Sequence, residues 1–244
     1  MILRTEHISK SYGEKQVLQD ISITLNEGEI ISLLGVSGVG KTTLFNVISG
    51  LLLPDSGKVF LNDEDITGKT GYLSYMLQKD LLLPHKTVLD NVALPLVLAG
   101  KKKKEARKEV DSYFAQFGLE GTQQKYPVQL SGGMRQRAAL LRTYMCGDSV
   151  ALLDEPFSAL DTLTRTAVHE WYLKVMDEIQ LSTVFITHDI DEAIMLSDRI
   201  YILSGSPAGI SAELTIEEPK PRDGEFLLSD SFLEYKRTIR RLLR

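Results

Sequence analysis

The stretch Gly35-Val-Ser-Gly-Val-Gly-Lys-Thr-Thr43 constrains the fold of this chain more than any other feature, because it directly follows the apolar run Ile30–Leu34. Its glycines let backbone N–H groups turn inward toward an anion, and a helix start adds the positive end of its dipole. The residues from Lys41 to Ser49 have the spacing of an amphipathic helix. A buried strand, a glycine-rich turn and a helix in this order predict an α/β fold that holds a nucleoside triphosphate.

The side chains at the end of this loop have distinct expected roles. Lys41 is expected to reach the β- and γ-phosphates, so it also acts on the phosphate that is transferred. The Thr42 hydroxyl is expected to bind Mg²⁺, which prefers oxygen ligands. The residues predicted to contact nucleotide here are Gly35, Ser37, Gly38, Gly40, Lys41, Thr42 and Thr43.

A pair of acids supplies the second half of such a site. The apolar run Val150–Leu153 ends in Asp154 and Glu155, and ligands of open α/β sheets bind at the carboxyl ends of strands. Asp154 is expected to hold the metal through water, and Glu155 to polarise the attacking water as general base. Taken alone, the pair is equally compatible with capping a helix.

The alternation of strands and helices continues along the chain. Apolar runs at Val150–Leu153 and Thr183–Thr187 precede helical patterns at Leu160–Ile179 and Ile190–Leu196. This order predicts a core with a largely parallel sheet. Near the N-terminus, short β-like runs separated by turn residues predict an antiparallel β-subdomain instead; they are Ile2–Ser9 and Ile21–Leu25.

Between Leu81 and Met145 the strand pattern gives way to helical spacing, which predicts an inserted α-helical subdomain. We predict a nucleotide-binding core of residues 1–78 and 147–215, a helical subdomain of residues 79–146 and a C-terminal extension of residues 216–244. The extension ends in a basic amphipathic helix from Phe232 to Arg244. Two interpretations of that helix stay open: packing on the core, or docking to anionic lipid or a membrane protein.

Composition excludes several classes of protein. A net charge of −5 argues against a nucleic-acid binder, because affinity for phosphate backbones comes from fields of lysine and arginine. No run reaches the roughly 18 apolar residues of a membrane span, and the N-terminus lacks a targeting pattern, so we expect a cytoplasmic location. The single Cys146 excludes an internal disulfide, and we expect it to be a small buried side chain.

The stretch Leu130-Ser-Gly-Gly-Met-Arg-Gln-Arg137 resembles the signature motif of the ATP-binding cassette (ABC) family, a branch of the P-loop NTPases. Ser131 has the character of a helix N-cap, and Gly132 and Gly133 leave room for backbone amides to approach an anion. This is half of a second phosphate site. Met134 stands where many cassettes have glutamine, which puts in doubt only a side-chain contact at that position.

Four more residues match landmarks of the family. Tyr12 resembles the aromatic residue that stacks on adenine, and Gln78 resembles the hinge glutamine that reaches metal and water. Asp161, in Ser158-Ala-Leu-Asp161, resembles the loop residue that crosses the dimer interface. His188 resembles the histidine that contacts the γ-phosphate. The resemblance covers residues 1 to about 215.

The resemblance implies a division of labour among several subunits. ATP with Mg²⁺ would sit between two copies, each covering the other's nucleotide with residues 131–133, so the ATP state is expected to be a homodimer or paired cassette. Membrane-spanning permease subunits would be separate chains that hold it at the cytoplasmic face of the membrane, and residues 79–98 would dock against them. Finer resemblance points to importers of nitrate, sulfonate, taurine or thiamine-precursor pyrimidines, which also use an extracytoplasmic solute-binding protein.

Two other classes remain as alternatives. A non-transport ABC ATPase would act on nucleic acid or ribosomes, but such proteins usually carry long coiled-coil insertions or two cassettes, and this sequence shows neither. A P-loop kinase or GTPase would leave Ser131, Gly132, Gly133 and His188 without a role. We therefore predict an ATPase subunit of an importer that does not bind nucleic acid.

Overall fold

The structure, a computed structural model, describes residues 1–158, 162–220 and 222–243, with the side chains of residues 162–167 excepted. Its centre is a six-stranded sheet of β4 (Ile30–Leu34), β7 (Ser74–Met76), β8 (Val150–Asp154), β9 (Ser182–Thr187), β10 (Arg199–Ser204) and β11 (Gly209–Thr215). Their order is β11-β10-β4-β9-β8-β7, and all neighbours are parallel except β10 and β11. The predicted α/β fold with a largely parallel sheet is confirmed.

Both faces of this sheet are covered, which explains why its inner strands are continuous apolar runs. Along β4, the side chains of Ile30 and Leu34 join one hydrophobic cluster, whereas Ile31 and Leu33 join another. The same alternation continues in β8, where Leu153 and Leu152 point to opposite faces. The period of two residues along a strand therefore divides the core into two layers.

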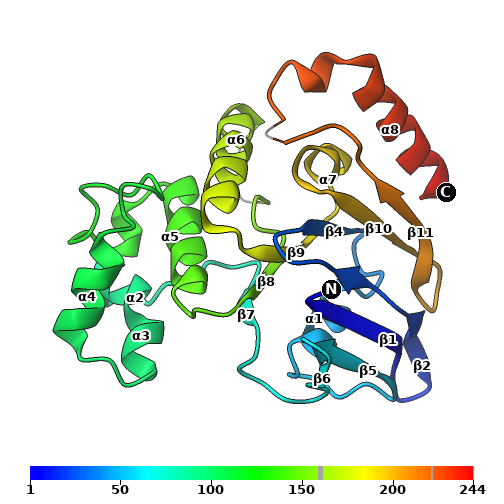
Figure 1. The fold of residues 1–244 in the computed structure, drawn as a ribbon, viewed down its shortest axis with the longest axis horizontal. Coiled ribbons are helices and arrows are strands. Elements are labelled where there is room, and N and C mark those ends of the chain that lie inside the picture. The colour runs from blue at the N-terminus through cyan, green and yellow to red at the C-terminus, as the bar shows by residue number, and fades with distance from the viewer. Residues whose placement is uncertain (159–161, 221, 244) are drawn as a thin grey trace.

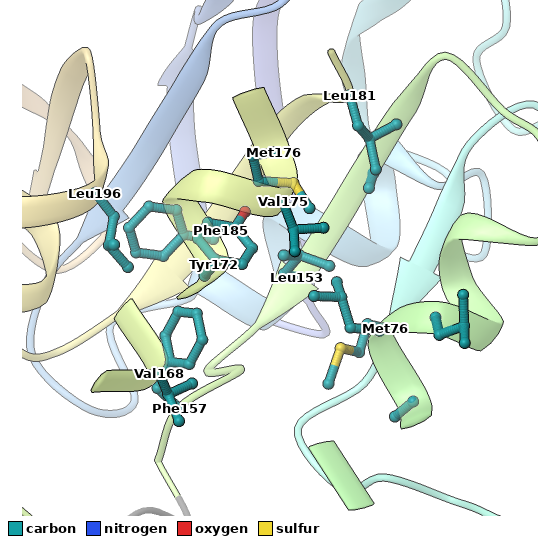
Figure 2. Close-up of a cluster of buried hydrophobic side chains, with 14 of the residues drawn as sticks. Met76, Leu153, Phe157, Val168, Tyr172, Val175, Met176, Leu181, Phe185 and Leu196 are labelled. Atoms are coloured by element: carbon teal, nitrogen blue, oxygen red, sulfur yellow. The ribbon is translucent and has the colours of Figure 1, made fainter. Parts of the chain in front are cut away.

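Different helices fill the two layers (Figure 1). Helix α1 (Lys41–Ile48) packs on one face with Leu44 and Phe45. Helices α6 (Thr162–Ile179) and α7 (Ile190–Leu196) pack on the other. Figure 2 shows this second layer, where Tyr172 of α6 lies among Leu153 of β8, Phe185 of β9 and neighbouring side chains.

A second, antiparallel sheet lies against α1. It consists of β1 (Leu3–Tyr12), β2 (Lys15–Ile21), β3 (Thr24–Leu25), β5 (Ser56–Leu61) and β6 (Glu64–Asp65), in the order β2-β1-β5-β6 with β3 also paired to β1. The predicted antiparallel N-terminal sheet is thus present. The run predicted at Ile21–Leu25 is wrong as one strand, because the chain leaves β2 at Ile21 and pairs again only at Thr24.

The regular elements between β7 and β8 are all helical. They are α2 (Val88–Val92), α3 (Leu94–Leu98), α4 (Lys103–Asp111), the 3₁₀ turn η1 (Pro127–Gln129) and α5 (Gly132–Tyr144). In Figure 1, α2, α3 and α4 lie away from both sheets, and α5 stands between them and α6. Ala106 and Val110 of α4 and the following Phe114 and Phe117 are buried, as their helical spacing predicts.

The C-terminal segment forms η2 (Phe226–Leu228) and α8 (Asp230–Leu242), which packs on α7. Phe232 and Ile239 are buried in the core cluster, and Lys236 forms an ion pair with Asp191 of α7. The packing expected by the first interpretation of this helix is therefore observed. The guanidinium of Arg222 is also buried, and it donates hydrogen bonds to backbone carbonyls, among them Ile194 and Ser197 at the end of α7.

Two further observations concern expectations from composition. Cys146 follows α5 and is exposed, so the expected buried position is wrong. It lies where the chain leaves the helical region on its way to β8, and such connections run over the surface. Among the described residues, no helix is both long enough and apolar enough to cross a bilayer.

Candidate functional site

The glycine-rich loop joins β4 to α1 and depends on two close backbone approaches. A side chain at Gly35 would bring its Cβ atom within 2.7 Å of the carbonyl oxygen of Leu203. Gly40, the residue before α1, has a φ of +119°, and a Cβ atom there would lie 2.9 Å from the side chain of Leu18. Only glycine meets both demands without displacing its neighbours.

Lys41 lies inside this loop. Its side chain is buried, and its ammonium group donates hydrogen bonds to the carbonyl of Gly35 at 2.6 Å and to that of Val36 at 3.0 Å. Burial lowers the pKa of Lys41, and the carboxylates of Glu155 and Asp154 act in the opposite direction. The loop therefore curls around a cation, an arrangement suited to phosphate.

Asp154 and Thr42 form the second contact of the site. The Thr42 hydroxyl donates a hydrogen bond to Oδ2 of Asp154 at 3.1 Å, which joins α1 to the end of β8. Asp154 is buried, and this burial raises its pKa, while the bond from Thr42 lowers it. A hydroxyl and a carboxylate at one point are hard oxygen donors of the kind that Mg²⁺ prefers.

The same donor set indicates how a metal would be held. Among the described residues, no group of three or more histidine, cysteine or acidic side chains is arranged to bind a metal ion. Mg²⁺ usually keeps several waters and takes one or two protein oxygens together with phosphate oxygens. Thr42 and Asp154 fit that pattern.

Glu155 is the residue at which the remaining predicted side chains meet. Its Oε2 accepts a hydrogen bond from Nε2 of Gln78 at 3.0 Å, and Nδ1 of His188 lies 3.0 Å from Oε1. The φ of Glu155 is +47°, which is unusual for a residue with a side chain and costs free energy unless its surroundings hold it. Its own N–H donates to the carbonyl of Ile186. The carboxylate is thus fixed by side chains from two segments, and the backbone of Glu155 by the end of β9.

A cavity of about 350 Å³ brings the loop and the carboxylate together. It is lined by Ser37, Gly38, Gly40, Lys41, Thr42 and Thr43 of the loop, by Gln78 and Glu155, and by Val17 and Ile186. Val17 and Ile186 were not predicted, because they reach the cavity through sheet packing rather than through a motif. They add apolar walls next to the phosphate-binding loop.

A larger cavity, of about 720 Å³, lies elsewhere, between residues 26–30, α6 and the side chains of Lys220, Arg222 and Asp223. It shares no residue with the glycine-rich loop and lies at the amino ends of β4 and β10. Ligands of parallel sheets bind at the carboxyl ends of strands, where Asp154 and Glu155 stand. The smaller cavity therefore holds the candidate site.

Some predicted residues do not line that cavity, among them Gly35, Asp154 and His188, which lie next to residues that do. Tyr12, at the end of β1, is 53% exposed and is not part of the lining. Ser131 caps α5, and its hydroxyl accepts a hydrogen bond from the N–H of Met134. Within one chain, neither Ser131 nor the glycines after it join the cavity lining. Asp161 falls outside the described residues.

The sequence and the fold of this chain were compared with those of known proteins. The ABC transporter family matches over residues 18–158. The formylaminopyrimidine import ATP-binding protein ThiZ of Halalkalibacterium halodurans is 44% identical over 84% of this chain and 81% of its own length. The nitrate import ATP-binding protein NrtD of Synechocystis sp. is 37% identical over 95% and 90%. An ATP-binding cassette dimer in a post-hydrolysis state, bound to ADP and Pi, aligns with a TM-score of 0.76 and 28% identity over 89% of this chain and 100% of its own.

Proposed function

The chain belongs to the ABC transporter family and is an ATPase, and from that premise we propose that it powers the import of a small solute through separate permease subunits. The observation that carries the proposal is the carboxylate of Glu155, held between Gln78 and His188 at the wall of the phosphate-loop cavity. Import is favoured because several relatives are named as import ATP-binding proteins.

We assign the hydrolytic step to the residues around this carboxylate. Glu155 accepts a proton from the attacking water, since its two oxygens are oriented by Gln78 and His188. Lys41 and the backbone amides of the loop hold the phosphates, and His188 contacts the γ-phosphate. Thr42, Asp154 and Gln78 would hold Mg²⁺, which would neutralise charge on the phosphate oxygens when bound.

The signature residues act in trans in this proposal. Ser131, Gly132 and Gly133 lie outside the cavity of their own chain, yet an N-cap serine followed by two glycines suits a phosphate. They would close over ATP held by a second copy, as the likeness to a cassette dimer supports. Asp161 would cross the interface and Tyr12 would stack on adenine.

Coupling to transport requires a surface for the permease. The segment after Gln78 exposes Leu81 and Leu98, at 52% and 78% of their surfaces. Contiguous apolar surface is typical of docking sites, and these two leucines bring apolar surface to this segment. We propose that residues 79–98 contact the permease and hold the subunit at the cytoplasmic face of the membrane. A solute-binding protein outside the membrane would deliver the substrate, an anion or a pyrimidine by analogy with the named relatives.

The Glu155→Gln variant tests the proposed function. It keeps the shape of the side chain but cannot take a proton, so it should bind ATP, hydrolyse it at least about 100-fold more slowly and accumulate as a dimer. Light scattering after size-exclusion chromatography, with and without ATP and Mg²⁺, measures the assembly, and phosphate release measures turnover. Turnover close to that of the unmodified chain would remove Glu155 from its role. A variant that stays monomeric with ATP would contradict the split site.

A further inference from the structure

One guanidinium joins the segment after Gln78 to the signature motif. Nε of Arg135 lies 3.2 Å from Oδ2 of Asp80, with both side chains half-buried. Nη1 of the same guanidinium donates a hydrogen bond to the carbonyl of Leu130 at 2.9 Å. Leu130 directly precedes Ser131, the N-cap of α5. Arg135 therefore contacts both Asp80, two residues after Gln78, and Leu130, the residue before Ser131.

A second arginine of α5 fixes the same segment through its backbone. Arg142 donates hydrogen bonds to the carbonyl of Asp80 at 2.6 Å and to that of Leu81 at 2.8 Å. Leu81 has a φ of +45°, an uncommon conformation for leucine that persists only where surrounding contacts hold it. Arg135 and Arg142 are seven residues apart and so lie on one face of the helix.

These contacts leave little freedom between two functional groups. Gln78, whose amide donates to Glu155, is two residues from Asp80, so the Cα atoms of the two residues are at most about 7 Å apart. Asp80 is held to α5, a 13-residue helix that begins immediately after Ser131. The chain from Gln78 to Asp80, and the contacts of Asp80 with α5, therefore form a continuous path from Glu155 to Ser131.

We propose that Arg135 is a positioning residue that, through Asp80 and the Leu130 carbonyl, makes the signature loop of a chain respond to the state of Glu155 in the same chain. The inference rests on the proposed function, in which that loop closes over nucleotide bound to the partner. The state of one ATP site then reaches the other through the contacts that Arg135 makes with Asp80 and with the carbonyl of Leu130. The hydrogen bonds of Arg142 hold the backbone of residues 80 and 81 on α5. The contacts of Arg135 fix the position of Asp80 relative to Leu130 and Ser131.

The Asp80→Asn and Arg135→Met variants test this link in the Glu155→Gln background. A fluorescent ATP analogue at low protein concentration measures nucleotide affinity of the single chain, and sedimentation with ATP and Mg²⁺ measures the dimer dissociation constant. We expect nucleotide affinity to stay within about two-fold and dimerisation to weaken about ten-fold. The double variant should be no worse than Arg135→Met alone, because that substitution already removes the contact with Asp80 as well as the one with Leu130. Arg135→Lys should be intermediate, since lysine lacks the fork that makes both contacts.

Arg107→Met is the matched control. It removes a bidentate contact with Asp90, at 2.7 and 2.8 Å, in the same helical region but away from Gln78. Dimerisation of Arg135→Met equal to that of the control, or additive losses in the double variant, would overturn the inference alone. A Glu155→Gln chain that fails to dimerise would overturn the proposed function and this inference with it.

Discussion

The hydroxyl of Thr42 donates a hydrogen bond to Oδ2 of Asp154, and this contact is the direct link between the phosphate-binding loop and the acidic end of β8. The bond stabilises the ionised form of Asp154, but burial raises the pKa of the same carboxyl. The carboxylate therefore costs the fold free energy in the absence of ligand. Such a cost is typical of a site prepared for a cation.

Replacing Asp154 by asparagine should stabilise the chain without ligand. The raised pKa means that between pH 3.8 and the folded-state pKa the folded chain holds more protons than the unfolded one, so stability falls as pH rises. Above that window the cost is fully present, and below pH 3.8 it is absent. Asparagine removes the cost of the buried charge, so we expect Tm at pH 7.5 to rise by about 2–4 °C. A stabilisation of about 1 kcal/mol produces a shift of this order in a chain of this length.

The pH dependence of this gain is its control. At pH 5 the difference in Tm should be smaller, because Asp154 of the unmodified chain is closer to being protonated. Thermal scans with ATP and Mg²⁺ should reverse the order, since only the unmodified site gains the full stabilisation from ligand. A gain that does not change with pH would speak against the charge as its cause.

Thr42→Val should raise the Mg²⁺ concentration needed for half-maximal hydrolysis by at least about ten-fold, while Thr42→Ser should remain close to the unmodified chain. Valine keeps the volume but removes both the metal ligand and the hydrogen bond to Asp154. A Mg²⁺ titration of phosphate release at saturating ATP measures the difference. Equal Mg²⁺ requirements for the valine and serine variants would exclude the hydroxyl as a ligand.

Ser131→Asp and Ser131→Asn separate capping from phosphate binding. Both side chains are good N-caps, so the stability of α5 should change by less than about 0.5 kcal/mol in either variant. Only aspartate places a negative charge where the partner's phosphate is expected, so it should prevent ATP-driven dimerisation in the Glu155→Gln background. Light scattering compares the two. If the aspartate variant still dimerised, Ser131 would not lie next to the phosphate bound by the partner.

Tyr12→Ala should raise the KM for ATP about ten-fold, because stacking of a base on an aromatic ring contributes about 1–3 kcal/mol. Tyr12→Phe keeps the ring and should keep the KM. The side chain is 53% exposed, so neither variant should change Tm by more than about 1 °C. An unchanged KM for the alanine variant would remove Tyr12 from the adenine site.

Local patterns predicted the central elements well. Strands β4, β8 and β9 were expected because each is a continuous apolar run, and that pattern follows from burial on both faces. Strands β10 and β11 were not predicted. Strand β11 is an edge strand whose residues are nowhere fully buried, so its sequence lacks the apolar signal. Its place is set by pairing with β10, a contact that no local pattern contains.

In the candidate site, too, local spacing predicted some residues, whereas contacts that depend on the order of the strands were not predicted. Residues 35–43 were predicted because their spacing alone determines the loop, and most of them line the cavity. That Gln78 and His188 both contact Glu155 depends on β7, β8 and β9 being neighbours in the sheet, which a single sequence does not state. Asp80, Arg135 and Arg142 were missed for a related reason, because charged residues beside a motif are usually solvated.

The buried guanidinium of Arg222 changes how the end of the chain should be treated in the laboratory. It supplies donors to Ile194 and Ser197 from 28 and 25 positions further along the sequence, and α7 begins two residues after His188. A chain trimmed before residue 222 would leave those carbonyls buried without the Arg222 donor, at the end of the helix that follows His188. The last part of the sequence therefore stabilises the end of α7, and affinity tags belong beyond it rather than in its place.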